Sequence, residues 1–324
     1  MFSGKYGRDI QVIGVPFSDG CNSVGVSLGP ASLRAAGVVS RLRGCTGSAV
    51  DYGDIAYECL PESDSVRMKR MASVSGMASR LSDTVYHCME AGRMPVVLGG
   101  DHSVAIGSVN GVARYCKSIG RELFVLWLDA HGDFNSPATS VTGNAHGMPA
   151  ALLSGEQGLV EILDSRADVV VDPRNICAFS VRWLDPAEQL LLVERGVSVV
   201  TMRDIDHAGI HSTLGDFLER VRQSSGLLHL SFDIDAVDPQ VAPGVSTPEP
   251  GGLTLREANS IMEMLAECDM LCSVDLVEVN PQFDVRNKTS ELAVSLLAVL
   301  FGQRIIDTRR NSLARDALTA VRYG

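Results

Sequence analysis

Short, continuous apolar runs alternate with longer stretches of mixed polar and apolar residues along most of the chain. Apolar runs without internal alternation are typical of strands in a parallel sheet that is covered on both faces. The runs from which we predict strands are residues 10–15, 49–51, 96–98, 123–128, 176–180, 197–201, 227–232 and 273–277.

The stretches between these runs carry apolar residues at helical spacing. Pro30 and Pro186 suit the first turn of a helix, and Asp185 suits the capping position before one. Examples of the helices that we predict are residues 30–42, 63–91, 186–194, 254–266 and 290–301. Predicted strands and helices alternate over the whole length of the chain. This order predicts a single three-layer α/β/α domain, residues 1–324, with a central, mainly parallel eight-stranded sheet. We expect residues 303–324 to form a C-terminal tail at the surface or in a subunit contact.

Composition narrows the class of protein. With 45% hydrophobic and 21% charged residues, the 324-residue chain is typical of a globular protein. Its formal net charge of −11 argues against nucleic acid as a partner. Residues 1–10 show no secretory signal, and the apolar stretch 292–301 is too short to cross a membrane. The eight cysteines form no Cys-x-x-Cys pair, which favours free thiols and a cytoplasmic location.

Acidic and imidazole side chains follow four of the predicted strands. In open α/β sheets, ligands bind beyond the carboxyl ends of the strands. We therefore expect these groups to meet at one rim of the sheet. The segments are residues 99–103 (Gly-Gly-Asp-His-Ser), 129–133 (Asp-Ala-His-Gly-Asp) and 231–238 (Ser-Phe-Asp-Ile-Asp-Ala-Val-Asp), followed by Glu278.

The spacing within these segments indicates a site for two metal ions. Asp129, His131 and Asp133 alternate along the chain, as do Asp233 and Asp235, so each set can face one side of an extended backbone. Buried carboxylates this close together repel one another unless they are protonated or paired. Four of them balance the charge of two divalent cations. The ligands that we predict are His102, Asp129, His131, Asp133, Asp233 and Asp235.

Ligand chemistry indicates both the metal and the reaction. Oxygen ligands with two imidazoles favour a hard ion such as Mn²⁺ over Zn²⁺, and leave Fe²⁺, Co²⁺ and Ni²⁺ as alternatives. Two divalent ions about 3.5–4 Å apart can share a water molecule and lower its pKa towards neutrality. The predicted chemistry is hydrolysis.

Residues 133–147 are rich in turn-forming and hydroxyl or amide residues, so we predict an irregular loop over the metal site. Asn135, Ser140 and Thr142 can donate hydrogen bonds to a substrate carboxylate, and His146 is placed to relay protons. Each of these groups could instead only cap the loop. A role in the site is favoured because the loop leaves directly from Asp133.

These motifs resemble those of arginases in the ureohydrolase family, manganese enzymes that cleave guanidino compounds into urea and an amine. The resemblance extends over nearly the whole chain. Besides the three metal segments, it includes residues 14–17 (Gly-Val-Pro-Phe), 29–30 (Gly-Pro), 247–248 (Thr-Pro), 251–252 (Gly-Gly), 278–281 (Glu-Val-Asn-Pro) and 291–294 (Glu-Leu-Ala-Val).

The resemblance implies two Mn²⁺ ions per subunit and a homo-oligomer, either a trimer or a hexamer. The first ion would be held by His102, Asp129, Asp133 and Asp233. The second would be held by His131, Asp129, Asp233 and Asp235, so that Asp129 and Asp233 bridge the two ions.

The resemblance also implies substrate contacts. Glu278 would pair with the guanidinium group, which stays protonated at any biological pH. His146 or Asp133 would give a proton to the departing amine. The residues implied to contact the rest of the substrate are Asn135, Ser140, Thr142, Asp185, Glu188 and Thr247.

L-Arginine, cleaved to L-ornithine and urea by water that the metals activate, is the substrate that the resemblance implies. Agmatine, guanidinobutyrate and formiminoglutamate stay open as alternatives, as does a catalytically silent metal-binding regulatory protein. Two departures from the family pattern keep these alternative substrates open. Thr142 stands where arginases usually carry serine, and Trp183 replaces an acidic residue beside Arg182.

Two further residues have less specific interpretations. Asp101 could orient the His102 imidazole or cap the helix that follows it. His229 has no ligand spacing, so we predict a core or surface histidine without a metal.

Overall fold

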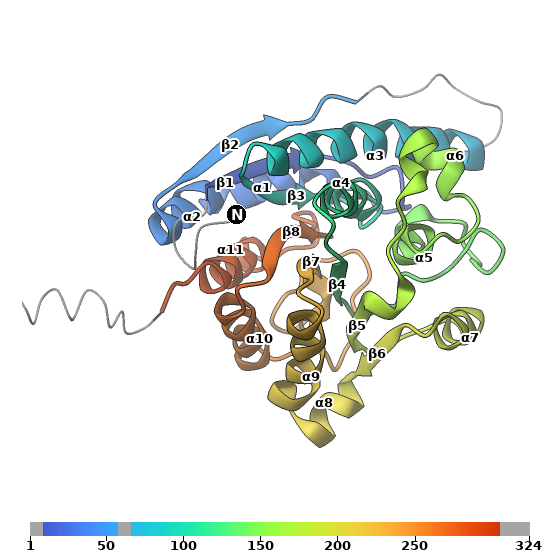
Figure 1. Cartoon of the computed structure of the whole chain (residues 1–324). Coiled ribbons are helices and arrows are strands. Elements are labelled where there is room, and N and C mark those ends of the chain that lie inside the picture. The colour runs from blue at the N-terminus through green and yellow to red at the C-terminus, as the bar shows by residue number, and fades with distance from the viewer. Residues whose placement is uncertain (1–8, 58–65, 305–324) are drawn as a thin grey trace, which may run out of the picture.

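A sheet of eight strands forms the centre of the computed structural model, which describes residues 9–57 and 66–304 (Figure 1). Every strand pairing is parallel, so the predicted sheet is confirmed. Its strands are β1 (Ile10–Val15), β2 (Ala49–Asp54), β3 (Met94–Gly99), β4 (Leu123–Leu128), β5 (Ile176–Val181), β6 (Ser198–Thr201), β7 (Leu227–Asp233) and β8 (Leu271–Val277).

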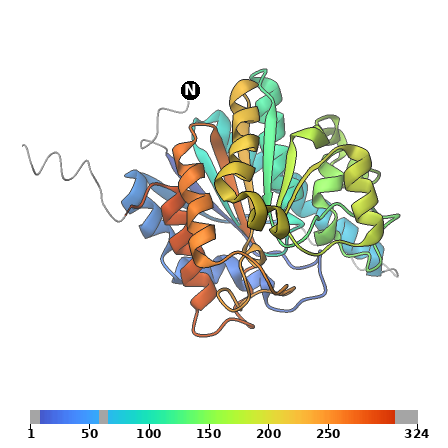
Figure 2. The same cartoon turned by 90° about the horizontal axis from the view of Figure 1, so that it is seen from below.

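Side chains in the central strands alternate between two hydrophobic cores, one on each face of the sheet. In β4, Phe124 and Leu126 belong to one core, whereas Val125 and Trp127 belong to the other. This explains the apolar runs without alternation, since both faces are buried. Helices cover both faces, so the predicted three-layer α/β/α arrangement is confirmed (Figure 2).

The first core is covered by α1 (Gly29–Ala35), α2 (Val38–Thr46), α8 (Met202–Ala208), α9 (Ile210–Gln223), α10 (Leu255–Glu267) and α11 (Lys288–Leu300). The second is covered by α3 (Val66–Glu90), α4 (Val104–Ser118), α5 (Pro149–Leu153), α6 (Leu159–Leu163) and α7 (Pro186–Arg195). The predictions for α7, α10 and α11 are confirmed to within two residues. The predicted start of α3, residues 63–65, and residues 305–324 of the predicted tail lie outside the described residues.

One predicted helix was wrong. Residues 30–42 belong to two helices, α1 and α2, which are separated by Gly37. This glycine has φ 87°, in the left-handed region that residues with a side chain rarely adopt. The apolar spacing continues across the break, so the periodicity alone did not reveal it.

The strand order, β2-β1-β3-β8-β7-β4-β5-β6, places the four strands with polar carboxyl ends next to one another. Their ends are also level, because Leu276 of β8 pairs with both Leu98 of β3 and Phe232 of β7, and Phe232 pairs with Leu128 of β4. The residues that follow these strands therefore meet at one rim in the middle of the sheet.

Within the described part of the chain, no helix is both long and apolar enough to cross a membrane. Seven of the eight cysteines lie in that part, and all seven are free thiols.

Candidate active site

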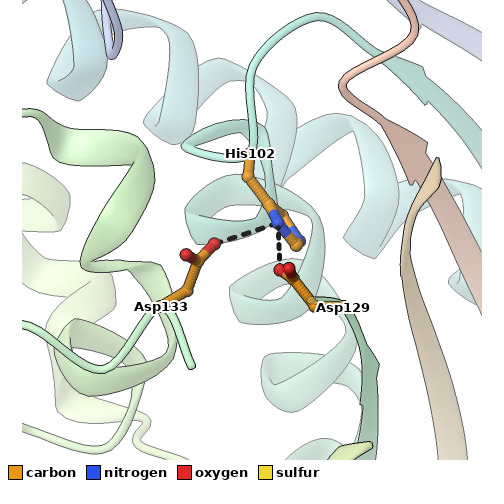
Figure 3. Close-up of side chains that lie close together, drawn as sticks. All are labelled: His102, Asp129 and Asp133. Carbon is orange, nitrogen blue, oxygen red and sulfur yellow. Dashed lines mark ion pairs between the residues drawn. The ribbon is translucent and has the colours of Figure 1, made fainter. Parts of the chain in front are cut away.

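The first group of predicted ligands surrounds His102, which lies between β3 and α4 (Figure 3). Its Nδ1 atom is 2.9 Å from Asp133 Oδ2 and 3.1 Å from Asp129 Oδ2. Asp233 Oδ2 is 3.2 Å from the same nitrogen. All four side chains are buried. The ends of β4 and β7 thus deliver three carboxylates to the imidazole nitrogen of a histidine that follows β3.

The second group surrounds His131, whose Nδ1 atom is 3.2 Å from both Asp129 Oδ1 and Asp235 Oδ2. Asp129 therefore divides its two oxygens between the two histidines. Asp233 turns only Oδ2 towards His102, while its Oδ1 accepts the Asp235 N–H at 2.8 Å. The structure brings all six predicted ligands together as two adjacent groups that share Asp129, and two sets of three among them are close enough to hold an ion.

The hydrogen bonds behind His102 test whether this cluster suits a metal. Its Nε2 atom is 2.9 Å from Ser231 Oγ, which donates to Asp275 Oδ1 at 2.7 Å. Because the serine proton goes to Asp275, His102 must supply the proton on Nε2. Neutral His102 then points its Nδ1 lone pair at three carboxylate oxygens, and this buried atom has no hydrogen-bond partner. Such an arrangement needs a cation between the groups.

Without an ion, the facing carboxylates attract a proton to His102 instead. Burial, and next the neighbouring Asp129, raise the pKa of Asp133 to about 6. Burial lowers the pKa of His102, but the facing carboxylates, Asp133 first, outweigh it and raise the pKa well above its ordinary value. The cluster attracts positive charge, and the oxygen-rich donor set fits divalent ions.

Sequence reasoning missed a buried network that supports this histidine. Asp275 Oδ2 accepts hydrogen bonds from Ser108 and from His229 Nε2, the latter at 3.0 Å. His229 Nδ1 lies 2.7 Å from Ser273 Oγ. His229 is a core residue, as one of its two interpretations held, but it also fixes the carboxylate that holds Ser231. The available signal was an aspartate in the otherwise apolar β8.

Trp127 was also missed. Its Nε1–H donates to Asp129 Oδ2 at 3.0 Å, and its ring stacks on His102 with centroids 4.3 Å apart. Asp101, in contrast, is not among the described residues whose polar groups lie within hydrogen-bond distance of the His102 ring nitrogens. It accepts hydrogen bonds from Ser103 at the start of α4 and from Gly20 N–H at 2.8 Å. Of the two alternatives for Asp101, these contacts favour the local one at the start of the helix.

Glu278 and His146, two of the predicted catalytic residues, contact each other. His146 Nδ1 is 3.1 Å from Glu278 Oε1, which also accepts the His102 N–H at 2.9 Å. Glu278 Oε2 is buried and has no hydrogen-bond partner. Burial lowers the pKa of His146, but the hydrogen bond to Glu278 and the charges of the neighbouring carboxylates together outweigh burial and raise the pKa to about 9. His146 therefore holds a proton at neutral pH.

Backbone strain marks the same residues. Asp133, the third predicted catalytic residue, has φ 48°, and Glu278 has φ 62°. Both lie in the left-handed region, which is uncommon for residues with a side chain. Such strain persists where the surrounding structure fixes the conformation, and it concentrates at functional sites.

A cavity of about 360 Å³ opens next to the metal ligands. All six residues implied to contact the rest of the substrate line it, together with His146, whereas Glu278 is not among the lining residues. The lining residues are His131, Asp133, Asn135, Ser140, Thr142, Asn144, His146, Gly147, Trp183, Asp185, Glu188, Asp233, Thr247, Pro248 and Glu249. None of them is a lysine or an arginine.

Hydrogen bonds hold the carboxylates of this cavity in place. Glu188 accepts the Phe134 N–H at 2.8 Å and the Asp185 N–H at 3.2 Å, and burial raises its pKa to about 7. Asn135 Nδ2 donates to Asp185 Oδ2 at 3.2 Å. Thr247 Oγ1 donates to Asp235 Oδ2 at 3.1 Å, so this threonine contacts a predicted metal ligand as well as the cavity.

The sequence was compared with protein-family models and with known proteins to identify its family. Residues 8–302 match the model of the Arginase family. A protein from Bacillus caldovelox named arginase is 39% identical over 304 residues, which cover 92% of this chain and 100% of that relative. The chain belongs to the arginase family. As a member it is an enzyme, a hydrolase, and the predicted resemblance is confirmed.

Solved structures of the family have the same fold. The native structure of arginase from Bacillus caldovelox superposes with a TM-score of 0.84 at 38% identity, over 92% of this chain and 100% of that one. Arginase from Entamoeba histolytica, solved in complex with L-ornithine, has a TM-score of 0.84 at 28% identity with the same coverage.

Proposed function

We propose that the protein hydrolyses L-arginine to L-ornithine and urea at a binuclear manganese centre. The observation that carries this proposal is the division of the cavity lining. Neutral donors from residues 135–144 form one part, and the carboxylates of Asp185, Glu188 and Glu249 form another. An α-amino acid has one negative and one positive group at its head, and these two parts complement them. Relatives that carry the name arginase support the choice of L-arginine.

The buried ligand groups would hold the two ions. We assign His102, Asp133 and Asp233 to one ion and His131 and Asp235 to the other, with Asp129 between them. The oxygen-rich set favours Mn²⁺. When bound, such a pair supplies Lewis-acid activation of water for hydrolysis.

Substrate recognition would begin at the head of the amino acid. Asn135, Ser140 and Thr142 present amide and hydroxyl groups that can donate to the α-carboxylate. Asp185 and Glu188 would receive the α-ammonium group. This assignment accounts for the lack of lysine and arginine among the lining residues, since a cationic substrate would be repelled by them.

The guanidinium group would be held by Glu278, which lies behind the cavity lining and contacts the lining residue His146. Glu278 has one oxygen, Oε2, that lacks a hydrogen-bond partner. A buried carboxylate oxygen without a partner is unfavourable, and a guanidinium N–H satisfies it. Entry of the substrate would therefore complete the hydrogen bonding of Glu278 and orient the guanidinium carbon.

His146 would protonate the departing amine. Since its pKa lies near 9, it is protonated at neutral pH, and its Nδ1–H donates to Glu278. The proton on Nε2 is then available for the nitrogen that leaves as L-ornithine. Asp133 is the alternative donor that the resemblance implies.

The test is urea release by the purified, Mn²⁺-loaded protein from L-arginine, agmatine, 4-guanidinobutyrate and formiminoglutamate in parallel. We expect the largest kcat/KM with L-arginine. Absence of urea from L-arginine at neutral and alkaline pH would overturn the proposal. Faster turnover of another compound would keep the chemistry and change the substrate.

We further propose that residues 1–324 act as a single catalytic domain in a cytoplasmic homo-oligomer. The free cysteines support a reducing compartment. Light scattering of the purified protein would test the trimer or hexamer that the resemblance implies.

A further inference from the structure

Trp183 is a large aromatic residue at the opening of the cavity. It is 47% exposed, although tryptophan is usually well buried, and it lines the cavity beside Asp185, Glu188 and Glu249. Its ring lies at 70° to the His131 imidazole, with centroids 5.9 Å apart. The indole therefore contacts a predicted metal ligand and shares the cavity lining with three carboxylates.

The backbone around Trp183 is firmly held, so this position is set by the fold. Trp183 N–H and Arg182 N–H both donate to Ala130 O, at 3.2 and 2.9 Å. The Arg182 guanidinium donates in turn to the carbonyl oxygens of Asp235 and Glu249, at 2.6 and 2.7 Å. These bonds join the backbone of residues 182–183 to two metal-ligand segments, so the point from which the Trp183 side chain leaves the chain is fixed relative to the metal ligands.

An aromatic ring beside carboxylates is chemistry that binds a cationic group. The face of an indole attracts ammonium groups, and neighbouring carboxylates add charge attraction. Neither feature favours an anion. The neutral hydrogen-bond donors for a carboxylate lie elsewhere in the lining, in residues 135–144. The ammonium group and the carboxylate of a zwitterionic substrate would thus be recognised by different parts of the cavity lining.

We propose that Trp183 determines substrate specificity by packing its indole against the α-ammonium group of the substrate, beside Asp185 and Glu188. The inference rests on the proposed hydrolysis of guanidino compounds and adds a recognition element to it.

The test compares Trp183→Ala and Trp183→Phe with the unchanged protein. L-Arginine and agmatine carry an ammonium group, whereas 4-guanidinobutyrate carries none. For Trp183→Ala we expect KM, or Ki when the compound acts only as an inhibitor, to rise about 3- to 30-fold for the first two. KM or Ki should rise less for 4-guanidinobutyrate than for these two compounds, and Trp183→Phe should retain part of the affinity. A matched control is Leu190→Ala, an exposed apolar residue on α7 that does not line the cavity.

Fluorescence gives a readout that does not need turnover. The chain has two tryptophans, and Trp127 is fully buried, so ligand entering the cavity should change mainly the emission of Trp183. Titration with L-ornithine should change the emission of the unchanged protein and leave Trp183→Phe with little response.

The outcomes separate this inference from the proposed function. Equal KM changes for all three compounds, or none, in a protein that releases urea would overturn the role of Trp183 and leave the function standing. If the unchanged protein releases no urea, the proposed function fails, and the L-ornithine titration still shows whether Trp183 meets an ammonium ligand.

Discussion

Replacing Ser231 by alanine should weaken metal binding without touching a predicted metal ligand. The serine hydroxyl accepts from His102 Nε2 and donates to Asp275 Oδ1, and it is fully buried. In Ser231→Ala both partners lose a hydrogen bond, so the His102 ring is no longer held with its Nδ1 lone pair towards the carboxylates. Retention of divalent ions should fall.

The size of the effect follows from the groups left without a partner. Each buried polar group that loses its hydrogen bond costs about 1–3 kcal/mol, and about 1.4 kcal/mol is a tenfold change in affinity. Asp275 keeps its bonds from Ser108 and His229, so most of the loss falls on His102. We expect Mn²⁺ affinity to fall about 10- to 100-fold, as is usual for groups behind a metal ligand.

Competition with a chelator of known affinity, followed by elemental analysis, measures this change directly. The matched control is Ser273→Ala, which also removes a buried serine hydroxyl but one that contacts His229 instead of His102. Thermal melting of both metal-free variants corrects for general destabilisation. If Ser231→Ala retains Mn²⁺ as well as Ser273→Ala does, the proposed orientation of His102 by Ser231 is wrong.

Three further changes test other parts of the structure. His146→Ala should lower urea release about 10²- to 10⁴-fold, the usual loss for a general acid, while elemental analysis finds the metal content unchanged. Gly100→Ala should unfold the rim or lower Tm strongly, because a Cβ atom there would lie 1.8 Å from the backbone oxygen of Phe17. Asp83→Asn should cost about 0.2–1 kcal/mol at pH 7, since its pair with Arg166 is partly solvent-screened. Because the hydrogen bond from Arg166 holds the pKa of Asp83 below 3.8, this stabilisation is present above pH 3.8 and disappears as the pH falls through the lowered pKa.

Each of these changes has a result that contradicts it. Loss of metal from His146→Ala would mean that the histidine supports the ions. A Tm for Gly100→Ala equal to that of the unchanged protein would refute the close packing at Phe17. A Tm difference for Asp83→Asn that grows as the pH falls below 3.8 would show that this aspartate is not held ionised in the folded protein.

The parts of the site that could be predicted from sequence are local in the chain. Asp129, His131 and Asp133 lie within five residues, directly after an apolar run, so both their common direction and their place at a strand end can be read from the spacing. Eight apolar runs likewise predicted eight strands, because a strand that is buried on both faces can be recognised from its own apolar residues.

Features that depend on which strands are neighbours in the sheet could not be predicted from the sequence. Asp275 reaches Ser231 only because the two are partners in the β7–β8 register. Strand order is not visible in the apolar runs, so this aspartate had no apparent role. The break at Gly37 was missed for a different reason: glycine also occurs inside helices, and only the backbone angle shows that this one ends a helix.

The strand order has a consequence for how the chain is made. β3 pairs with β8, so that Val96 lies opposite Val274, although most of the chain separates them. Contacts between such distant segments form slowly, because a long loop must close before they give any stability. As the nascent chain leaves the ribosome, His102 and Asp129 emerge before Asp233 and Glu278, which complete the site. Metal uptake should therefore wait until β8 and Glu278 have been synthesised.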